Sequence, residues 1–173
     1  LCRCDVKVLG LRWRTCATSS VSRLEWAVDL MGGVPTENWL YAAASARNLK
    51  VVQRLRRYGC PWDHFTCSYA AKEGHLEILQ WARASGCPWD EYTCIGAAEG
   101  GHLDVLRWAR ANGCPWDEYT CAGAASGGHL EILQWARANE CPWDISTCIL
   151  GSANGRLELI KWARANGCPW NGP

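Results

Sequence analysis

The sequence predicts an all-α solenoid in which short helix-turn-helix hairpins stack on one another as repeats. Three observations lead to this prediction. The chain of 173 residues contains 12 Trp and 12 Cys, but only one Phe and one Met. The tripeptide Cys-Pro-Trp returns every 27 residues, beginning at Cys60, Cys87, Cys114, Cys141 and Cys168. Between two copies the apolar residues follow helical spacing, and no proline interrupts them.

Three further patterns keep the same register. Thr-Cys begins at Thr66, Thr93, Thr120 and Thr147; Gly-His-Leu begins at Gly74, Gly101 and Gly128, with Gly155-Arg156-Leu157 as a fourth copy; Trp-Ala-Arg begins at Trp81, Trp108, Trp135 and Trp162. We therefore predict a repeat domain over 33–173, with repeats at about 33–59, 60–86, 87–113, 114–140 and 141–167 and a partial one at 168–173. Residues 1–32 match the pattern poorly and are predicted to form an irregular N-terminal capping unit.

The unit at residues 90–115 shows how one repeat is expected to fold. Asp90 suits the N-cap of a first helix over Tyr92–Glu99, because its carboxylate can accept hydrogen bonds from the free amides of the first turn. The small residues of this helix would allow a close approach to a neighbouring helix. Gly100-Gly101 is expected to end the helix, since glycine adopts the left-handed backbone of a helix end. A second helix is predicted over His102–Ala111, and Asn112-Gly113 stops it.

The charge is small overall but unevenly placed. The net charge of +1 argues against nucleic-acid binding across the whole surface. Residues 1–58 carry 10 Lys/Arg and 4 Asp/Glu, a net of +6, whereas residues 59–173 carry 8 and 13, a net of −5. The basic end includes a patch made of Arg47, Lys50, Arg54, Arg56 and Arg57. This patch would suit docking onto an acidic partner.

The sequence says less about location. No apolar run approaches the roughly 18 residues of a membrane span, so no transmembrane segment is predicted. The first residue is Leu rather than Met, so a processed or truncated chain is expected. An intracellular location, in the cytoplasm or an organelle, is favoured.

Each well-formed unit holds cysteine at two fixed positions seven residues apart, for example Cys60 and Cys67. A zinc site would need four converging ligands and usually a Cys-x-x-Cys element, which does not occur in the chain. Cysteines of one column in adjacent units should lie too far apart for a disulfide, whereas a bridge within a unit stays open. The favoured interpretation is that they are small buried packing residues. No metal or other cofactor is predicted.

Four other columns of the repeat have structural interpretations. Tryptophan on the second helix is interpreted as packing between repeats; tryptophan in the following turn is interpreted in the same way, with an exposed aromatic binding strip as the alternative. The histidines of Gly-His-Leu are expected to cap a helix or to donate hydrogen bonds. The column of Arg83, Arg110, Arg137 and Arg164 lies where cations complement a helix C-terminus.

These residues resemble the ankyrin repeat over 33–173. The resemblance rests on Asp-x-x-Thr, Ala-Ala, Gly-His-Leu-Glu-Ile-Leu and the closing Asn-Gly. The usual unit has about 33 residues, and the residues missing here fall where ankyrin repeats project a β-hairpin finger. The resemblance therefore implies an ankyrin-like solenoid of helical hairpins with little or no β-hairpin.

The resemblance also implies a recognition surface. In ankyrin-like proteins the residue before Thr and the pair after Ala-Ala line the concave face, and in this chain the copies differ at these positions. The residues before Thr are Phe65, Tyr92, Tyr119 and Ser146. The pairs at the positions after Ala-Ala contribute Lys72, Glu73, Glu99, Ser126 and Asn154. Tyrosine and phenylalanine are good anchors for protein interfaces. Protein binding along this face is therefore expected.

The chain carries no glycine-rich phosphate loop, catalytic-triad signature or metal motif, and repeats account for nearly all of it. We therefore predict a non-enzymatic scaffold for protein–protein interaction, whose partners are other proteins. The alternative is a structural subunit that is held permanently in a larger multiprotein assembly, for example at the periphery of a membrane complex.

Overall fold

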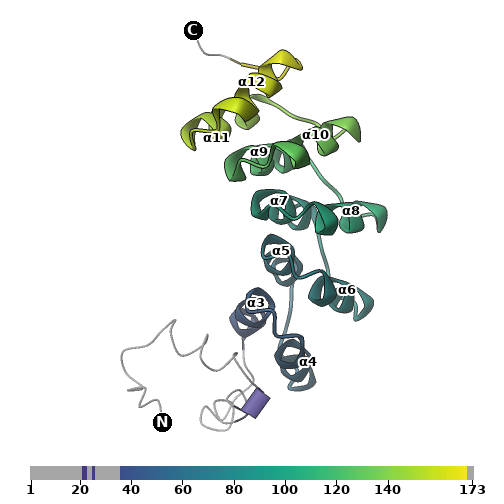
Figure 1. Ribbon diagram of the computed structural model, residues 1–173. Coiled ribbons are helices and arrows are strands. Elements are labelled where there is room, and N and C mark those ends of the chain that lie inside the picture. The colour runs from purple at the N-terminus through teal and green to yellow at the C-terminus, as the bar shows by residue number, and fades with distance from the viewer. Residues whose placement is uncertain (1–20, 23–24, 26–35, 171–173) are drawn as a thin grey trace, which may run out of the picture.

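The computed structural model describes residues 21–22, 25 and 36–170, and it shows an all-α repeat solenoid (Figure 1). Within residues 36–170, helices follow one another as hairpins and no strand occurs, which confirms the predicted fold class. The helices are α3 (Glu37–Ser45), α4 (Leu49–Arg57), α5 (His64–Lys72), α6 (Leu76–Ala84), α7 (Glu91–Gly100), α8 (Leu103–Ala111), α9 (Glu118–Gly127), α10 (Leu130–Ala138), α11 (Ile145–Ala153) and α12 (Leu157–Ala165). The predicted capping unit at 1–32 lies outside the described residues, apart from Val21, Ser22 and Glu25.

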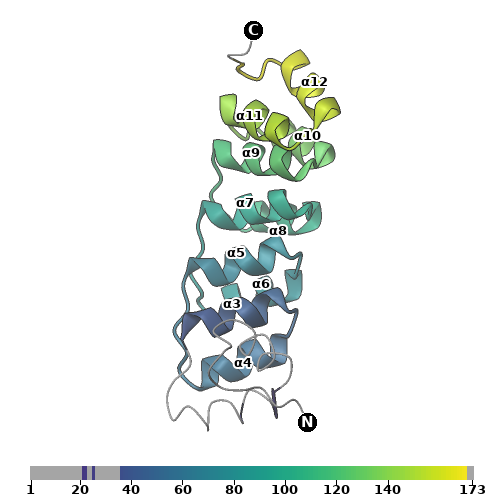
Figure 2. The ribbon, with the colours of Figure 1, turned by 90° about the vertical axis from the view of Figure 1, so that its left-hand side faces the viewer.

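The first helices of the hairpins stack in one row, and the second helices stack in another (Figures 1 and 2). Each first helix packs closely on the first helix of the next unit, whereas a second helix packs mainly on the first helix of its own hairpin. The stack is therefore curved. The first helices line its inner side, and the second helices spread along its outer side.

Aspartate is the N-cap of the first helices α5, α7, α9 and α11, as predicted, whereas the N-cap of α3 is Thr36. The Asp90 side chain caps α7 by accepting a hydrogen bond of 3.1 Å from the Tyr92 amide, and the equivalent aspartates cap α5, α9 and α11. The predicted bounds differ from the observed ones by one residue. Helix α7 begins at Glu91 and includes Gly100, so that Gly101 alone takes the left-handed backbone, with φ +85°. His102 is the N-cap of α8 rather than its first residue.

Small residues allow the first helices to approach one another closely. A Cβ added at Gly100 would lie 1.9 Å from the carbonyl oxygen of Lys72 in α5, and one at Gly96 would lie 2.8 Å from that of Ser68. The same arrangement returns one unit later, where a Cβ at Gly127 would lie 2.4 Å from the carbonyl oxygen of Glu99. Even a methyl group would therefore push these helices apart.

Large aromatic residues fill the outer side. The indole of Trp89, in a turn, packs edge to face on the indole of Trp108 in α8, and their ring centroids lie 5.9 Å apart. The turn tryptophans that make the equivalent contact with the next second helix are Trp62, Trp116 and Trp143. The Arg83 guanidinium lies 4.2 Å from the centroid of Trp89 and donates a hydrogen bond to the carbonyl oxygen of Cys87. The arginine column therefore holds the turn and its tryptophan, beyond the predicted role at a helix C-terminus. The indoles are partly buried and pack against the core.

The cysteines at positions 60–168 are free thiols in the core. The Cys87 thiol donates a hydrogen bond of 3.4 Å to the carbonyl oxygen of Asp63, and Cys114 repeats this contact with Asp90 at 3.3 Å. The thiol of Cys67 pairs with that of Cys87, and this hydrogen bond together with burial raises the pKa of Cys67. The cysteine columns thus pair across successive units, an arrangement that the sequence did not predict.

Candidate protein-binding surface

The first predicted row of binding residues forms an exposed aromatic strip on the first helices. Phe65, Tyr92 and Tyr119 are the second residues of α5, α7 and α9, and their exposed fractions are 40%, 49% and 53%. Ser146 occupies the same place in α11, but it is half-buried and its hydroxyl donates a hydrogen bond of 3.2 Å to Asp144. The aromatic strip therefore covers three units and ends before α11.

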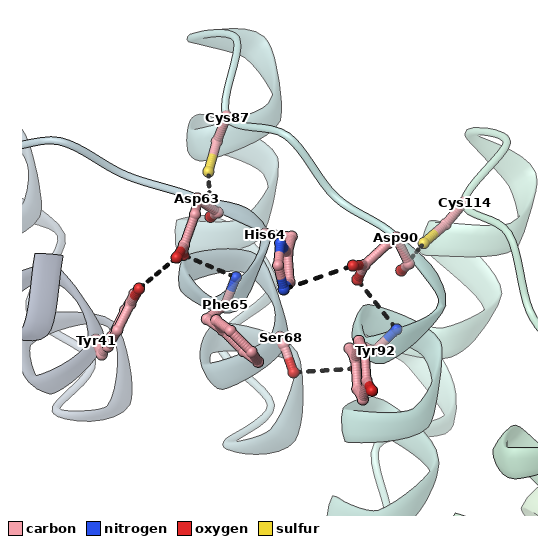
Figure 3. A network of polar contacts seen from close by, with 9 residues as sticks. All are labelled: Tyr41, Asp63, His64, Phe65, Ser68, Cys87, Asp90, Tyr92 and Cys114. Atoms are coloured by element: carbon pink, nitrogen blue, oxygen red, sulfur yellow. Dashed lines mark hydrogen bonds and ion pairs between the residues drawn. The ribbon is translucent and has the colours of Figure 1, made fainter.

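The rings at the N-terminal half of this strip contact one another (Figure 3). The centroids of Phe65 and Tyr92 lie 6.0 Å apart, and Tyr41 of α3 meets Phe65 edge to face at 6.2 Å. Tyr41 also lies 5.4 Å from Tyr69, and the His64 ring stacks on Tyr92 at 6.1 Å. We call the set Tyr41, His64, Phe65, Tyr69, Tyr92 and Tyr119 the aromatic surface.

Tyr41 and Tyr69 were not among the residues predicted for the site. Tyr41 belongs to the column that holds Ser68, Ile95 and Ala122 in the next units. Tyr69 stands where α7 has the buried Gly96, but it is itself 41% exposed. Both columns differ between copies, so variation within the repeat was the signal that could have indicated them.

A hydrogen bond ties Tyr41 of the aromatic surface to the start of α5 (Figure 3). The Tyr41 hydroxyl donates to Asp63 Oδ2 at 2.6 Å, while Asp63 Oδ1 accepts from the Phe65 amide at 3.0 Å. Partial burial and the bond to Asp63 raise the pKa of Tyr41, so it stays protonated. The Tyr41 ring is therefore held in place before any partner arrives, which reduces the entropy that this side chain loses on binding.

Carboxylates border the aromatic surface. Burial raises the pKa of Asp90 and of Asp117, and the neighbouring charges of Glu91 and Glu118 raise them further. His64 Nε2 lies 3.6 Å from Asp90 Oδ2, and its positive charge when protonated would lower the pKa of Asp90. The electrostatic character of this border is negative, so it complements a basic segment.

The second predicted row lies at the opposite ends of the same helices. Lys72 Nζ forms an ion pair of 2.9 Å with Glu99 of the next unit, and the amide of Asn154 donates to Ser126 Oγ at 3.4 Å. Glu73 is exposed at the C-cap of α5. These side chains link neighbouring units, and an exposed ion pair contributes at most about 1 kcal/mol to stability.

The structure divides the predicted basic patch. Arg56 is the first member of the repeat's arginine column, since its guanidinium lies 3.9 Å from the centroid of Trp62 and donates to the Cys60 carbonyl oxygen. Arg54 bonds to Glu25 at 2.5 Å. Arg47, Lys50 and Arg57 remain as exposed cations on α4 or next to it.

Apolar side chains are exposed on the last hairpin. Ile149 and Leu150 of α11 are 50% and 37% exposed, and Leu157 of α12 is 67% exposed. The residues equivalent to Leu150 in α7 and α9 are Gly96 and Gly123, which are buried against the preceding helix, whereas Tyr69 at the same position of α5 is exposed. The last hairpin thus presents an exposed aliphatic surface that α7 to α10 lack.

The remaining polar columns join the units. His75 Nε2 lies 3.0 Å from the carbonyl oxygen of Ser45, and His129 Nε2 lies 3.1 Å from that of Glu99. These histidines thus make the predicted hydrogen bonds, although they do not cap the following helix with their side chains. Among the residues that the structure describes, no group of three or more His, Cys, Asp or Glu side chains could hold a metal ion. In the same part of the chain, no helix has the length and apolar composition needed to cross a membrane.

No protein-family model matches the chain, and no curated protein matches it significantly. The resemblance to ankyrin repeats therefore rests on the residues themselves.

Proposed function

We propose that this chain is a non-enzymatic scaffold that binds another protein through the aromatic surface on its inner side. The main support is the exposure of Phe65, Tyr92 and Tyr119 at equivalent positions of successive units. Aromatic rings exposed in a row on one face are typical of interfaces, where they supply most of the binding energy. The resemblance to ankyrin repeats supports the same conclusion by analogy.

The carboxylate border indicates the chemistry of the partner. Asp90, Glu91, Asp117 and Glu118 lie beside the exposed rings of Tyr92 and Tyr119. Lysine and arginine can pair with these carboxylates and can also lie over the ring faces. The proposed partner therefore presents a basic segment to the inner side.

Site-specific photo-crosslinking tests this proposal. A benzophenone amino acid is placed at Tyr119, and at the exposed Glu131 of α10 as the matched control, and crosslinked chains are identified by mass spectrometry. We expect a partner that crosslinks at position 119 and not at position 131. Its yield should fall in the Tyr92→Ser variant, which changes only a neighbouring ring. Equal crosslinking at both positions, or yields unaffected by Tyr92→Ser, would contradict the proposal.

The exposed apolar surface on α11 and α12 favours a second candidate function, a structural subunit held in a larger assembly. Ile149, Leu150 and Leu157 would be buried if another chain packed against the last hairpin. A permanent interface should bury more than about 1,000 Å². A crosslinker at Leu157 distinguishes the two candidates, because only the structural subunit predicts a constant partner at that position.

A further inference from the structure

Two hollows open against α4, which belongs to the row of second helices (Figure 1). The larger lies between α4 and α6, has a volume of about 400 Å³ and is lined by Gln53, Arg56, Arg57, Trp62, Trp81 and Ser85. The smaller has a volume of about 280 Å³ and is lined by Val21, Glu25, Lys50, Gln53, Arg54 and Arg57. Because Gln53 and Arg57 line both hollows, the two adjoin along the helix. We call Lys50, Gln53, Arg57, Trp62 and Trp81 the α4 surface.

The α4 surface is basic at positions where the other units are not. Lys50 stands in the first turn of α4, where the other second helices have Glu77, Asp104, Glu131 and Glu158. Arg57 is the last residue of α4, whereas the other second helices end at Ala84, Ala111, Ala138 and Ala165. Both cations are exposed, and neither forms an ion pair with another described residue. The α4 surface therefore holds two cations that the repeat does not need for its own folding.

Lys50 is unfavourable for the helix that carries it. The first turn is the positive end of a helix, so an anion there stabilises the helix and a cation destabilises it. The first turn of α4 contains no acidic residue to offset this effect, and the Asn48 side chain caps the helix by accepting a hydrogen bond of 3.2 Å from the Val51 amide. A charge that opposes the folding of its own helix, where the other copies carry the opposite charge, indicates a role in binding.

The lining residues indicate the chemistry of a ligand. Lys50 and Arg57 can pair with carboxylates, and Arg57 can do so with two parallel hydrogen bonds. Among the described lining residues the one carboxylate is Glu25, which is already bonded to Arg54 at 2.5 Å. The indoles of Trp62 and Trp81, with centroids 5.9 Å apart, give the larger hollow an apolar wall. An acidic ligand that also carries a large apolar group therefore fits the α4 surface.

Two observations favour a protein as this ligand over a nucleic acid. The Arg56 guanidinium lies 3.9 Å from the centroid of Trp62 and covers one face of that ring, on which a base would otherwise stack. Residues 59–173 carry 8 Lys/Arg and 13 Asp/Glu, a net of −5, which would repel a long polyanion. We propose that the α4 surface binds an acidic segment of a partner protein, with one aromatic side chain of that segment in the hollow lined by Trp62 and Trp81. It would thus select the opposite charge to the aromatic surface.

A labelled peptide, Gly-Asp-Glu-Asp-Phe-Glu-Asp-Glu-Gly, tests this inference by fluorescence anisotropy with the purified chain at low ionic strength. We expect saturable binding that weakens as salt is added, because salt screens exposed charges. Replacing the phenylalanine of the peptide by glycine should weaken binding about tenfold, because the hollow then buries no apolar side chain. No saturable binding, or equal binding of the two peptides, would overturn the proposal.

Two variants that restore the residues of the other units locate the binding. Arg57→Ala removes a cation and should weaken binding about threefold, whereas Lys50→Glu reverses a charge and should weaken it about tenfold. Lys50→Glu should also raise the thermal midpoint, because it places an anion in the first turn of α4. A lower midpoint, which would show that Lys50 stabilises the fold, would contradict the argument for binding.

Lys161→Glu on α12 is the matched control, because it makes the same change in net charge at an exposed position far along the chain. It should leave the affinity for the peptide unchanged. Equal losses in Lys50→Glu and Lys161→Glu would show that net charge alone drives binding and would overturn the inference.

A labelled single-stranded oligonucleotide with the net charge of the peptide tests the other class of partner. It should bind at least about tenfold more weakly than the peptide, because the covered face of Trp62 cannot stack on a base. If it bound as tightly as the peptide and lost affinity in Lys50→Glu, the α4 surface would be a nucleic-acid site and the proposal would be wrong.

Discussion

Replacing Gly100 by alanine should destabilise the protein, although the same change in a helix is usually favourable. Alanine has a higher helix propensity than glycine, which favours the variant by up to about 1 kcal/mol. At Gly100, however, the new methyl group would lie 1.9 Å from the carbonyl oxygen of Lys72 and 2.9 Å from the His102 ring. Relieving this overlap requires α5 and α7 to separate, and overpacking of this kind costs about 1–3 kcal/mol. A contact of 1.9 Å with a backbone oxygen belongs at the upper end of this range, so after the propensity gain is subtracted the free energy of unfolding should fall by about 2 kcal/mol.

Gly151 in α11 provides the matched control. A Cβ at this position would meet only side-chain carbons, at 3.3 Å for Ile160 and 3.6 Å for Ala125, and the equivalent residue in α7 is Ala97. Gly151→Ala should therefore raise the free energy of unfolding by about 0.4–1 kcal/mol. Urea denaturation followed by circular dichroism and tryptophan fluorescence measures both changes. If Gly100→Ala stabilised the chain as Gly151→Ala does, the first helices would not pack as closely as described.

Three further predictions follow from the repeat. Trp108→Ala removes one ring of an indole pair and should cost about 3–5 kcal/mol; an unchanged thermal midpoint would contradict the packing role of this column. Glu140 has φ +65° where Gly113 has φ +81°, so Glu140→Gly should stabilise the chain by about 1 kcal/mol in chemical denaturation. Burial raises the pKa of Cys60 and of Cys168 from 9.0 to about 12. The unfolded chain therefore releases these protons at a lower pH than the folded chain does. The free energy of unfolding should fall as the pH rises from 9 towards 12, and in the Cys60→Ala variant it should fall less steeply.

Local rules were sufficient to predict the hairpins. Asp90 is followed by a helix because its side chain satisfies a free amide, and Gly101 ends that helix because it tolerates a positive φ. Both effects act over a few residues and repeat every 27 positions, so each copy supports the others. The error of one residue at Gly100 has a tertiary cause. Helix α7 continues there because a glycine is the one residue that fits against α5.

Contacts between units were harder to predict, since they join residues about one repeat apart. The thiols of Cys67 and Cys87 form a hydrogen bond because the chain comes back to the start of α5 after the second helix of the hairpin. There the Cys87 thiol also bonds to Asp63. Arg56 was assigned to a basic patch from its neighbours in sequence, but the register of the repeat assigns it to the column that stacks on turn tryptophans. In both cases the repeat position carried more information than the local sequence.

The curvature gives the inner and outer sides of the solenoid different surfaces. Glycine between the first helices and tryptophan between the second helices bend the stack in one direction. On the inner side this bending brings the exposed rings of Phe65 and Tyr92 within 6.0 Å of one another, so they form a continuous surface. On the outer side it spreads the indole pairs apart and leaves separate hollows between them. A continuous aromatic surface suits a partner with broad contacts. Binding along the inner side therefore depends on the glycine column, and substitutions that separate the first helices should weaken it.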